Sequence, residues 1–313
     1  MACFVGIDGG GTKTSAVVAN EEGTILGHTT AGPSNLIGST PERIREEFRR
    51  IKQGLNPYVP NWWDCVIFAG IAGTSHPKHH EQVFRCLQVV FDEGSRIVLD
   101  HDGLNALGSV TYGDPGVVQI AGTGSITFGL GKRGERCRIG GWGYLLGDEG
   151  SGFSLGKRAL VQVMKAYDGR GPATELTELA LCKWKLESPE DLIPYIYGER
   201  FRERIASFTF ELFKAFRNGD GVAVTIVEEA AEELALAIHT ALKRLDLTHQ
   251  ACPVGLIGGA FQSPLVDLVR KKLEQLLPVM PQLIRSETEP VIGALVWAFK
   301  IAGLDAKKLL LQG

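Results

Sequence analysis

A run of glycines follows an apolar stretch near the N-terminus, and its composition suits the binding of a phosphate. The run consists of Gly9, Gly10, Gly11, Thr12, Lys13 and Thr14. Glycine lets the backbone approach a ligand closely and adopt positive φ, so consecutive N–H groups can point at one anion. The threonines add hydroxyls and the lysine adds a cation. The sequence therefore predicts a phosphate loop here, with a plain hairpin turn as the alternative.

Asp8 stands immediately before this loop, at the end of the apolar stretch. A carboxylate there would repel a phosphate unless a cation lay between them. Mg²⁺ keeps several waters and takes only one or two carboxylates, so it fits this position. The residues thus favour a magnesium–nucleotide complex in which Asp8 contacts Mg²⁺ through water. The alternative is that Asp8 caps the turn.

The same plan recurs later in the chain. FVGIDGGGTKTSAVV begins at Phe4, and VVQIAGTGSITFGL begins at Val117. Each has an apolar strand, a Gly-Thr turn and a second strand, which predicts a duplicated unit. The second turn consists of Gly122, Thr123, Gly124 and Ser125. Two such lobes are expected to face each other across a cleft, where small ligands usually bind.

Other nucleotide and metal signatures are absent from the sequence. It has no G-x-x-x-x-G-K-[ST] loop and no protein-kinase motif set. Its six cysteines form no C-x-x-C pair, which argues against a zinc knuckle or a thioredoxin motif. The cysteines are instead predicted to be small buried residues of a protein in a reducing compartment.

The alternation of apolar runs and helical patterns predicts an α/β protein. Length supports two domains, because 313 residues exceed one average domain. In the first half we expect strands over 3–8, 15–20, 24–30, 64–73 and 95–100, with helices from Pro41, around Val83 and over 103–110. In the second half we expect strands over 117–130, a hairpin tip near 132–137, helices through 174–246, a strand within 253–261, and helices over 263–277 and 290–303.

Composition excludes several classes of protein. There are 33 basic and 36 acidic residues, so the net charge is −3. This balance argues against a protein that coats nucleic acid or an anionic membrane. The first residues resemble no signal peptide, and no apolar run is long enough to span a membrane. We therefore expect a cytoplasmic protein.

Four motifs in a fixed order carry a family resemblance: IDGGGTKT, AGTGS, GGWGYLLGDEGS and LIGGAF. With them the chain resembles the sugar-kinase branch of the actin/hexokinase/Hsp70-like ATPase superfamily, above all the N-acetylglucosamine kinases and BadF/BadG-type ATPases. The resemblance extends from residue 3 to about residue 303. It implies two ribonuclease-H-like (actin-like ATPase) domains with ATP and Mg²⁺ in an interdomain cleft, and a homodimer. The implied domains are residues 1–112 with 290–313, and residues 113–289.

The resemblance also implies roles for individual residues. Residues 8–14 and 122–125 match the two phosphate loops, and Gly258, Gly259 and Ala260 match the turn beneath adenosine. Asp102 matches the catalytic aspartate. The positions that match sugar-contacting residues are Ser34, Asn35, Gly73, Thr74, Asp102, Thr123, Gly141, Trp142 and Asp148.

The chemistry of phosphoryl transfer to a sugar independently requires a base. A sugar hydroxyl has a high pKa, so a positioned carboxylate must take its proton. Asp102 follows the strand SRIVLD and can project from its end. Asp100 is the competitor, and capping of the next helix is the structural alternative for Asp102. His101, between them, reads as incidental.

Two residues of the GGWGYLLGDEGS segment have structural alternatives too. The flat face of Trp142 suits a sugar or its acetyl methyl, but a core tryptophan would also pin this loop. Asp148 suits a sugar ligand, but it could also cap the following helix.

The main hypothesis is an ATP-dependent kinase for the 6-hydroxyl of N-acetylglucosamine, by in-line transfer with an aspartate base. Glucosamine, N-acetylmuramic acid and glucose remain alternative substrates. A second hypothesis is a non-enzymatic ATP-gated module of the same fold. The missing His/Cys zinc motif argues against the ROK branch, and the isolated cysteines argue against iron–sulfur dehydratase activators.

Overall fold

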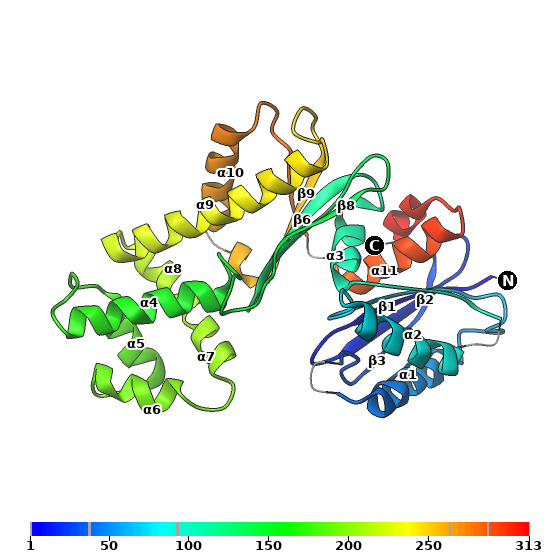
Figure 1. Ribbon diagram of the computed structural model, residues 1–313, viewed down its shortest axis with the longest axis horizontal. Helices are drawn as coiled ribbons and strands as arrows, with labels where there is room; N and C mark the ends of the chain where they lie inside the picture. Colours follow the sequence, from blue (N-terminus) through cyan, green and yellow to red (C-terminus); the bar gives the residue numbers. More distant parts are fainter. Residues whose placement is uncertain (1, 37–38, 92–93, 263, 287, 313) are drawn as a thin grey trace. The chain divides into compact units, whose positions relative to one another are not determined.

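The computed structural model describes residues 2–36, 39–91, 94–262, 264–286 and 288–312. The chain forms two compact units, which Figure 1 shows coloured along the sequence. Unit 1 comprises Met1–Pro115 and Ser286–Gly313, and unit 2 comprises Gly116–Arg285. The C-terminal segment therefore belongs to the same unit as the N-terminus.

Unit 1 contains a five-stranded sheet with the order β3-β2-β1-β4-β5. β1 pairs antiparallel with β2 and parallel with β4, and β4 pairs parallel with β5. The central strands are apolar and almost wholly buried, as expected for a sheet covered on both faces. The strands are β1 (Phe4–Gly9), β2 (Thr14–Ala19), β3 (Ile25–Ala31), β4 (Val66–Ile71) and β5 (Arg96–Asp100).

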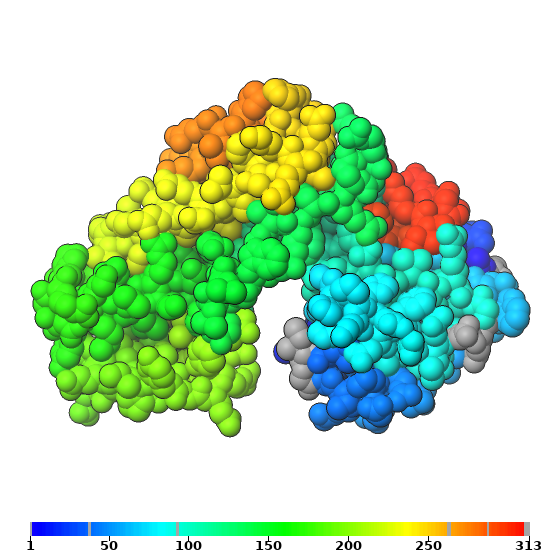
Figure 2. Space-filling model, viewed as in Figure 1, coloured from blue at the N-terminus to red at the C-terminus, as the bar shows by residue number. Residues whose placement is uncertain are grey.

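Helices cover both faces of this sheet. α1 (Pro41–Leu55) and α2 (Pro77–Phe91) share a core with Val5 and Ile7 of β1. Neighbouring residues of a strand point to opposite faces, so Phe4 faces the other way, and its ring packs against Phe299 of α11 (Pro290–Ile301). α11 also contacts α3 (Asp102–Thr111). Figures 1 and 2 show this C-terminal part in red against the rest of unit 1. A 3-10 helix over Ala306–Gln312 follows.

Two glycines allow α11 to lie directly on β1 and α3. A Cβ atom at Gly6 would stand 2.4 Å from the backbone nitrogen of Leu295. A Cβ atom at Gly293 would stand 1.7 Å from the carbonyl oxygen of Asn105. Real Cβ atoms do not approach backbone this closely, so these contacts require glycine. They hold α3, and the side chains at its start, in place against the sheet.

Unit 2 repeats the same sheet. Its order is β10-β9-β6-β7-β8, with β7 antiparallel to both of its neighbours, β6 and β8, and with β6, β9 and β10 parallel. This is the order and direction of unit 1, in agreement with the internal repeat of the sequence. The strands are β6 (Gly116–Ala121), β7 (Ser125–Leu130), β8 (Arg136–Gly140), β9 (Pro253–Ile257) and β10 (Gln282–Arg285).

A helical insertion separates β8 from β9, as the pattern over 174–246 predicts. α9 packs on β6, β7 and β8, and α10 packs on α9. The helices are α4 (Gly152–Tyr167), α5 (Leu176–Trp184), α6 (Leu192–Ile196), α7 (Phe201–Ser207), α8 (Thr209–Arg217), α9 (Gly221–Arg244) and α10 (Leu265–Leu276), with 3-10 turns at Pro189–Asp191 and Gly259–Gln262. Among the described residues, no helix has the length and apolarity needed to cross a bilayer.

Two strands differ from the sequence-based expectation. β8 begins at Arg136, inside the expected hairpin tip, and β10 was not expected at all. Both are edge strands with partly exposed, mixed residues, so neither shows a clear apolar period. The helix expected from residue 263 starts at Leu265, and residue 263 itself lies outside the described residues.

The contact of α11 with α3 makes a direct prediction. Gly293→Ala places a methyl group against backbone atoms that cannot move aside, so we expect a loss of about 3 kcal/mol or more in unfolding free energy. Urea unfolding followed by tryptophan fluorescence measures it. Gly221→Ala is the control, because nothing lies within 4 Å of a Cβ atom there. Equal stability of the two variants would contradict the close packing.

Candidate active site

The first glycine loop is a tight connection between β1 and β2. The N–H of Gly10 donates to the carbonyl of Lys13 over 2.9 Å, which closes the turn. Gly11, Thr12 and Lys13 are exposed. Within the part of the chain that the structure describes, their backbone N–H groups donate to no protein acceptor. They are therefore available to an anion.

Asp8 is fixed beside this loop by an asparagine that the sequence analysis did not single out. The Nδ2 atom of Asn105, on α3, donates to Oδ1 of Asp8 over 2.7 Å and to the carbonyl of Gly70 over 2.9 Å. A Cβ atom at Gly70 would stand 2.1 Å from the Asn105 side chain, so the glycine makes room for it. One amide thus ties together the ends of β1 and β4 and the start of α3. A buried asparagine inside an otherwise apolar helix was the only signal in the sequence.

The environment of Asp8 disfavours its charge. Burial raises the pKa of the Asp8 carboxyl from 3.8 to about 6; the hydrogen bond from Asn105 opposes the increase, and the negative charge of Asp102 adds to it. The negative charge of Glu289 also raises the pKa of Asp8, and the positive charge of Lys13 lowers it. A site with several nearby carboxylates attracts a cation and needs one before it can accept a phosphate.

Four buried polar atoms without a hydrogen-bond partner surround this loop. They are Ser34 Oγ, Asn35 Oδ1, Asn105 Oδ1 and Asp102 Oδ1, of which the last has Nδ1 of His101 2.7 Å away, a contact that is a hydrogen bond only when that nitrogen carries a proton. Ser34 and Asn35 lie against Gly9 and Gly11, since Cβ atoms at those glycines would stand 2.2 Å from Ser34 Oγ and 3.3 Å from Asn35 Nδ2. An unpaired buried polar group costs roughly 1–3 kcal/mol, and such groups concentrate where a ligand supplies the partner.

Asp102 is the first residue of α3 and follows β5 by one residue. It does not cap the helix. The N-cap is His101, whose Nδ1 accepts from the N–H of Gly103 over 3.1 Å. The interpretation of Asp102 as the cap is therefore wrong, and His101 has a structural role as that cap. Asp100, the competitor, accepts a hydrogen bond at Oδ1 from the backbone N–H of His101.

Gly73 and Thr74 lie at the end of β4. Gly73 has φ +83°, which favours glycine. The Thr74 hydroxyl is buried and donates within the fold, with the carbonyls of Ile71 and Asp100 at 2.7 and 3.1 Å. Thr74 joins the ends of β4 and β5, so its hydroxyl already has protein partners.

The second glycine loop connects β6 to β7 and lies on the N-terminus of α4. The N–H groups of Gly152 and Phe153 donate to the carbonyls of Gly122 and Thr123 over 2.8 and 3.3 Å. Asp148 is 5% exposed and has φ +60°, a strained conformation for a residue other than glycine. Its Oδ2 stands 3.0 Å from the Cβ position of Gly124. Ser151, and not Asp148, caps α4.

A pocket of about 320 Å³ brings the second loop together with the Gly258–Ala260 turn. Gly122, Thr123, Gly259 and Ala260 line it, and nothing lies within 4 Å of a Cβ atom at Gly122 or Gly259. The opposite wall comes from α7 and α8 of the helical insertion, with residues that the sequence analysis missed: Glu203, Ala206, Ser207, Thr209, Phe210 and Phe213. The helical spacing of these residues predicts a face that packs against the core, and nothing in it indicates a ligand.

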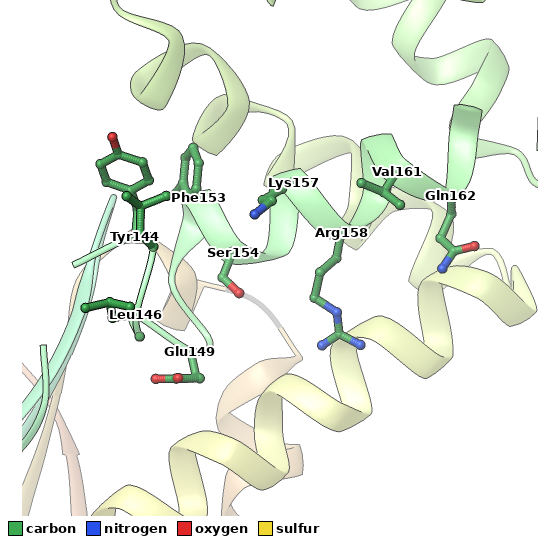
Figure 3. Close-up of a pocket in the computed structure, with 11 residues that line it drawn as sticks. Tyr144, Leu146, Glu149, Phe153, Ser154, Lys157, Arg158, Val161 and Gln162 are labelled. Atoms are coloured by element: carbon green, nitrogen blue, oxygen red, sulfur yellow. The ribbon is translucent and has the colours of Figure 1, made fainter. Parts of the chain in front are cut away.

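Trp142 is not a core residue, because 65% of its surface is exposed. The Arg138 guanidinium stands 4.5 Å from its ring centre and donates to the carbonyl of Gly141. Beyond it, Leu146 and Glu149 of the same loop and Lys157 and Arg158 of α4 line a separate pocket of about 450 Å³ (Figure 3). Asp148 does not line this pocket, because its carboxylate lies beside the second glycine loop.

The residues present fit a magnesium nucleotide. The first loop offers free N–H groups and a lysine, and the pocket of unit 2 offers open glycines beside an exposed phenylalanine, Phe210. No cluster of three or more His, Cys, Asp or Glu side chains with metal-binding geometry occurs among the described residues. Mg²⁺ bound to phosphates does not need such a cluster, since one carboxylate and waters complete its shell.

Comparisons with known proteins show the family of this chain. The profile of the BadF/BadG/BcrA/BcrD ATPase family matches residues 5–298. The N-acetylmuramic acid/N-acetylglucosamine kinase of Clostridium acetobutylicum is 32% identical over 303 residues, 95% of this chain and 98% of its own. The N-acetyl-D-glucosamine kinase of Dictyostelium discoideum is 33% identical over 323 residues, 97% and 98% of the two chains.

Solved structures show the same architecture. A Chromobacterium violaceum protein assigned as an N-acetylglucosamine kinase superposes with a TM-score of 0.73 at 25% identity, over 95% of this chain and 98% of that one. The fold of this chain is therefore that of the two-domain actin-like sugar kinases, as the sequence resemblance predicts.

The buried carboxylate of Asp8 predicts a pH-dependent stability. Because its pKa is higher in the folded chain, the ionised group destabilises the ligand-free fold; the cost is absent below about pH 3.8 and complete above about pH 6. At neutral pH, Asp8→Asn should therefore raise the unfolding free energy by up to about 3 kcal/mol, since a tenfold change in proton affinity corresponds to about 1.4 kcal/mol. Urea titrations at pH values across this window measure the difference between variant and wild type.

The control is Glu22→Gln, which makes the same charge change at an exposed turn. Its effect on stability should be close to zero at every pH. Mg²⁺ with ATP should stabilise the wild type more than Asp8→Asn. A variant that is destabilised equally at all pH values would show that Asp8 is not a strained carboxylate.

Proposed function

The chain belongs to the BadF/BadG/BcrA/BcrD ATPase family, and from this premise we propose that it is an ATP-dependent kinase for an amino sugar, with N-acetylglucosamine as its main substrate and the 6-hydroxyl as the acceptor. Two relatives at 32% and 33% identity that cover almost the whole chain are kinases of N-acetylglucosamine, one of them also of N-acetylmuramic acid. A more distant relative, at 24% identity, is a glucosamine kinase of Vibrio cholerae.

The observation that carries the proposal is the set of unpartnered polar atoms in unit 1. Ser34 and Asn35 each bury an oxygen without a hydrogen-bond partner beside the first glycine loop, and the Asp102 carboxylate lies near enough to Asp8 to raise its pKa. A hydroxyl and an amide oxygen next to a carboxylate are suited to neighbouring hydroxyls of a sugar ring. Their position beside a loop with free N–H groups supports the proposal of an alcohol-binding site next to a phosphate-binding site.

In this proposal Asp102 is the general base. Its carboxylate takes the proton of the 6-hydroxyl while that oxygen forms a bond to the γ-phosphorus of ATP and the bond from phosphorus to the ADP oxygen breaks. Positioning and neutralisation of charge supply most of the catalysis in such transfers. The free N–H groups of residues 11–13 and the Lys13 ammonium would hold phosphate oxygens. Mg²⁺, when bound, neutralises phosphate charge, and Asp8 would hold it through water.

Unit 2 would bind the rest of both substrates. The pocket between Gly259-Ala260 and α8 suits adenosine, with Phe210 as an apolar surface for the base. Thr123, Gly141, Trp142 and Asp148 are proposed to contact the sugar, while Gly73 and Thr74 support the ends of β4 and β5. A homodimer and a cytoplasmic location are further parts of the proposal, and both rest on the family resemblance.

Replacing the proposed base tests the chemistry. Asp102→Asn should lower kcat by roughly 10²–10⁴-fold, because it removes the proton acceptor. ATP binding should change little. A coupled ADP-release assay over N-acetylglucosamine, N-acetylmuramic acid, glucosamine and glucose measures the rate and the preferred sugar.

Asp100→Asn is the matched control, because an amide oxygen can still accept from the N–H of His101. It should retain nearly all activity. If Asp100→Asn abolished the reaction and Asp102→Asn did not, the base would be misassigned. ADP release that no sugar stimulates would contradict the kinase itself and favour an ATP-gated module.

Phe210 tests the adenosine pocket. Its ring is 62% exposed, so truncation should leave the fold intact. Stacking of a base on an aromatic ring is worth about 1–3 kcal/mol, and Phe210→Ala should therefore raise the KM for ATP by about tenfold. The KM for the sugar should stay the same. Leu236→Ala, at another exposed apolar position of unit 2, serves as the control. An unchanged KM for ATP would remove Phe210 from the site.

A further inference from the structure

His101 stands next to the proposed base and makes two contacts through one nitrogen. Its Nδ1 lies 3.1 Å from the backbone nitrogen of Gly103 and 2.7 Å from Oδ1 of Asp102. The imidazole is 19% exposed. Its backbone is fixed as well, because its N–H donates to Asp100.

The two contacts cannot both be hydrogen bonds at the same time. Nδ1 carries either a lone pair, which can accept from Gly103, or a proton, which it can donate to Asp102. A separation of 2.7 Å between a nitrogen and a carboxylate oxygen is attractive only with a proton between them, and it is the shorter of the two contacts. With the lone pair on Nδ1, Oδ1 of Asp102 is the buried acceptor that lacks a donor.

The two oxygens of the Asp102 carboxylate also differ in their surroundings. Oδ1 is buried, whereas the side chain as a whole is 37% exposed. The exposed part therefore includes the other oxygen, Oδ2. An imidazole that holds Oδ1 would leave Oδ2 turned outward, where a hydroxyl can reach it.

We infer that His101 is a positioning residue for the phosphoryl transfer: its Nδ1–H holds Oδ1 of Asp102, so that Oδ2 meets the substrate hydroxyl. The inference rests on the proposed function, since it assigns the orientation of the proposed base. In the resting chain the same nitrogen caps α3, and the N–H of Gly103 gives up its acceptor when the proton lies on Nδ1.

Two neutral variants separate positioning from capping. Asparagine and serine are both good N-caps, so His101→Asn and His101→Ser should keep α3 and the melting temperature close to those of wild type. The asparagine amide can place a nitrogen where Nδ1 lies and can donate to Asp102. Serine is shorter and cannot reach Oδ1. We expect His101→Asn to keep most of kcat and His101→Ser to lose roughly 10- to 100-fold, because misplaced catalytic groups cost that much. The KM for ATP should be unchanged in both.

Equal kcat values for the two variants would overturn the inference, whether both match wild type or both fall together with the melting temperature. Nitrogen-15 NMR of the His101 ring gives a second readout that needs no activity. A protonated Nδ1 whose signal moves in Asp102→Asn supports the contact, and an unprotonated Nδ1 that ignores this substitution refutes it. If the wild type phosphorylated no sugar at all, the proposed function would fail while the NMR result still decided the contact.

Discussion

The hydrogen bond from Asn105 to Asp8 is the interaction on which the candidate site depends. It holds a carboxylate at the buried end of β1, where water is scarce and a second carboxylate, Asp102, lies close by. A buried carboxylate without a cation lowers the stability of the fold, so the position of Asp8 destabilises the ligand-free chain. Burial raises the pKa of Asp8 for that reason, and a cation held between Asp8 and phosphate would relieve the same strain. Binding of a magnesium nucleotide would therefore also relieve the unfavourable buried charge of Asp8.

Close contacts at two glycines connect this arrangement to the rest of unit 1. Gly293 brings α11 onto α3, and Gly70 leaves room for the Asn105 side chain. The C-terminal helix, far from the glycine loops in sequence, therefore fixes the helix that bears both Asn105 and Asp102. In unit 2 the equivalent strand pair is supported differently, because the N-terminus of α4 donates to the carbonyls of its loop. The two units share strand order and direction, while the groups that surround their loops differ.

Local features of the sequence were sufficient to predict the central strands of both sheets, the glycine turns that connect them and the family. Glycine runs after apolar strands have few other uses, and their order along the chain is specific. Features created by tertiary contacts were not predictable from sequence. Asn105 resembles any polar residue in a helix until β1 and β4 meet it, and Phe210 resembles a core residue until α8 is placed beside the Gly258–Ala260 turn. The structural alternative for Asp102, capping of α3, was wrong by one residue, because β5 ends at Asp100 and His101 accepts from the N–H of Gly103. Edge strands β8 and β10 escaped notice because half-exposed strands lack a strong apolar period.

In the proposed site, the unpaired buried oxygens of Ser34 and Asn35, together with Oδ2 of Asp102, take their partners from a sugar. A crystal structure of the protein with N-acetylglucosamine and an unreactive ATP analogue tests this most directly. It should show sugar hydroxyls within about 3.2 Å of Ser34 Oγ, Asn35 Oδ1 and an oxygen of Asp102. A sugar bound elsewhere, with no hydroxyl near Ser34, Asn35 and Asp102, would contradict the proposed site.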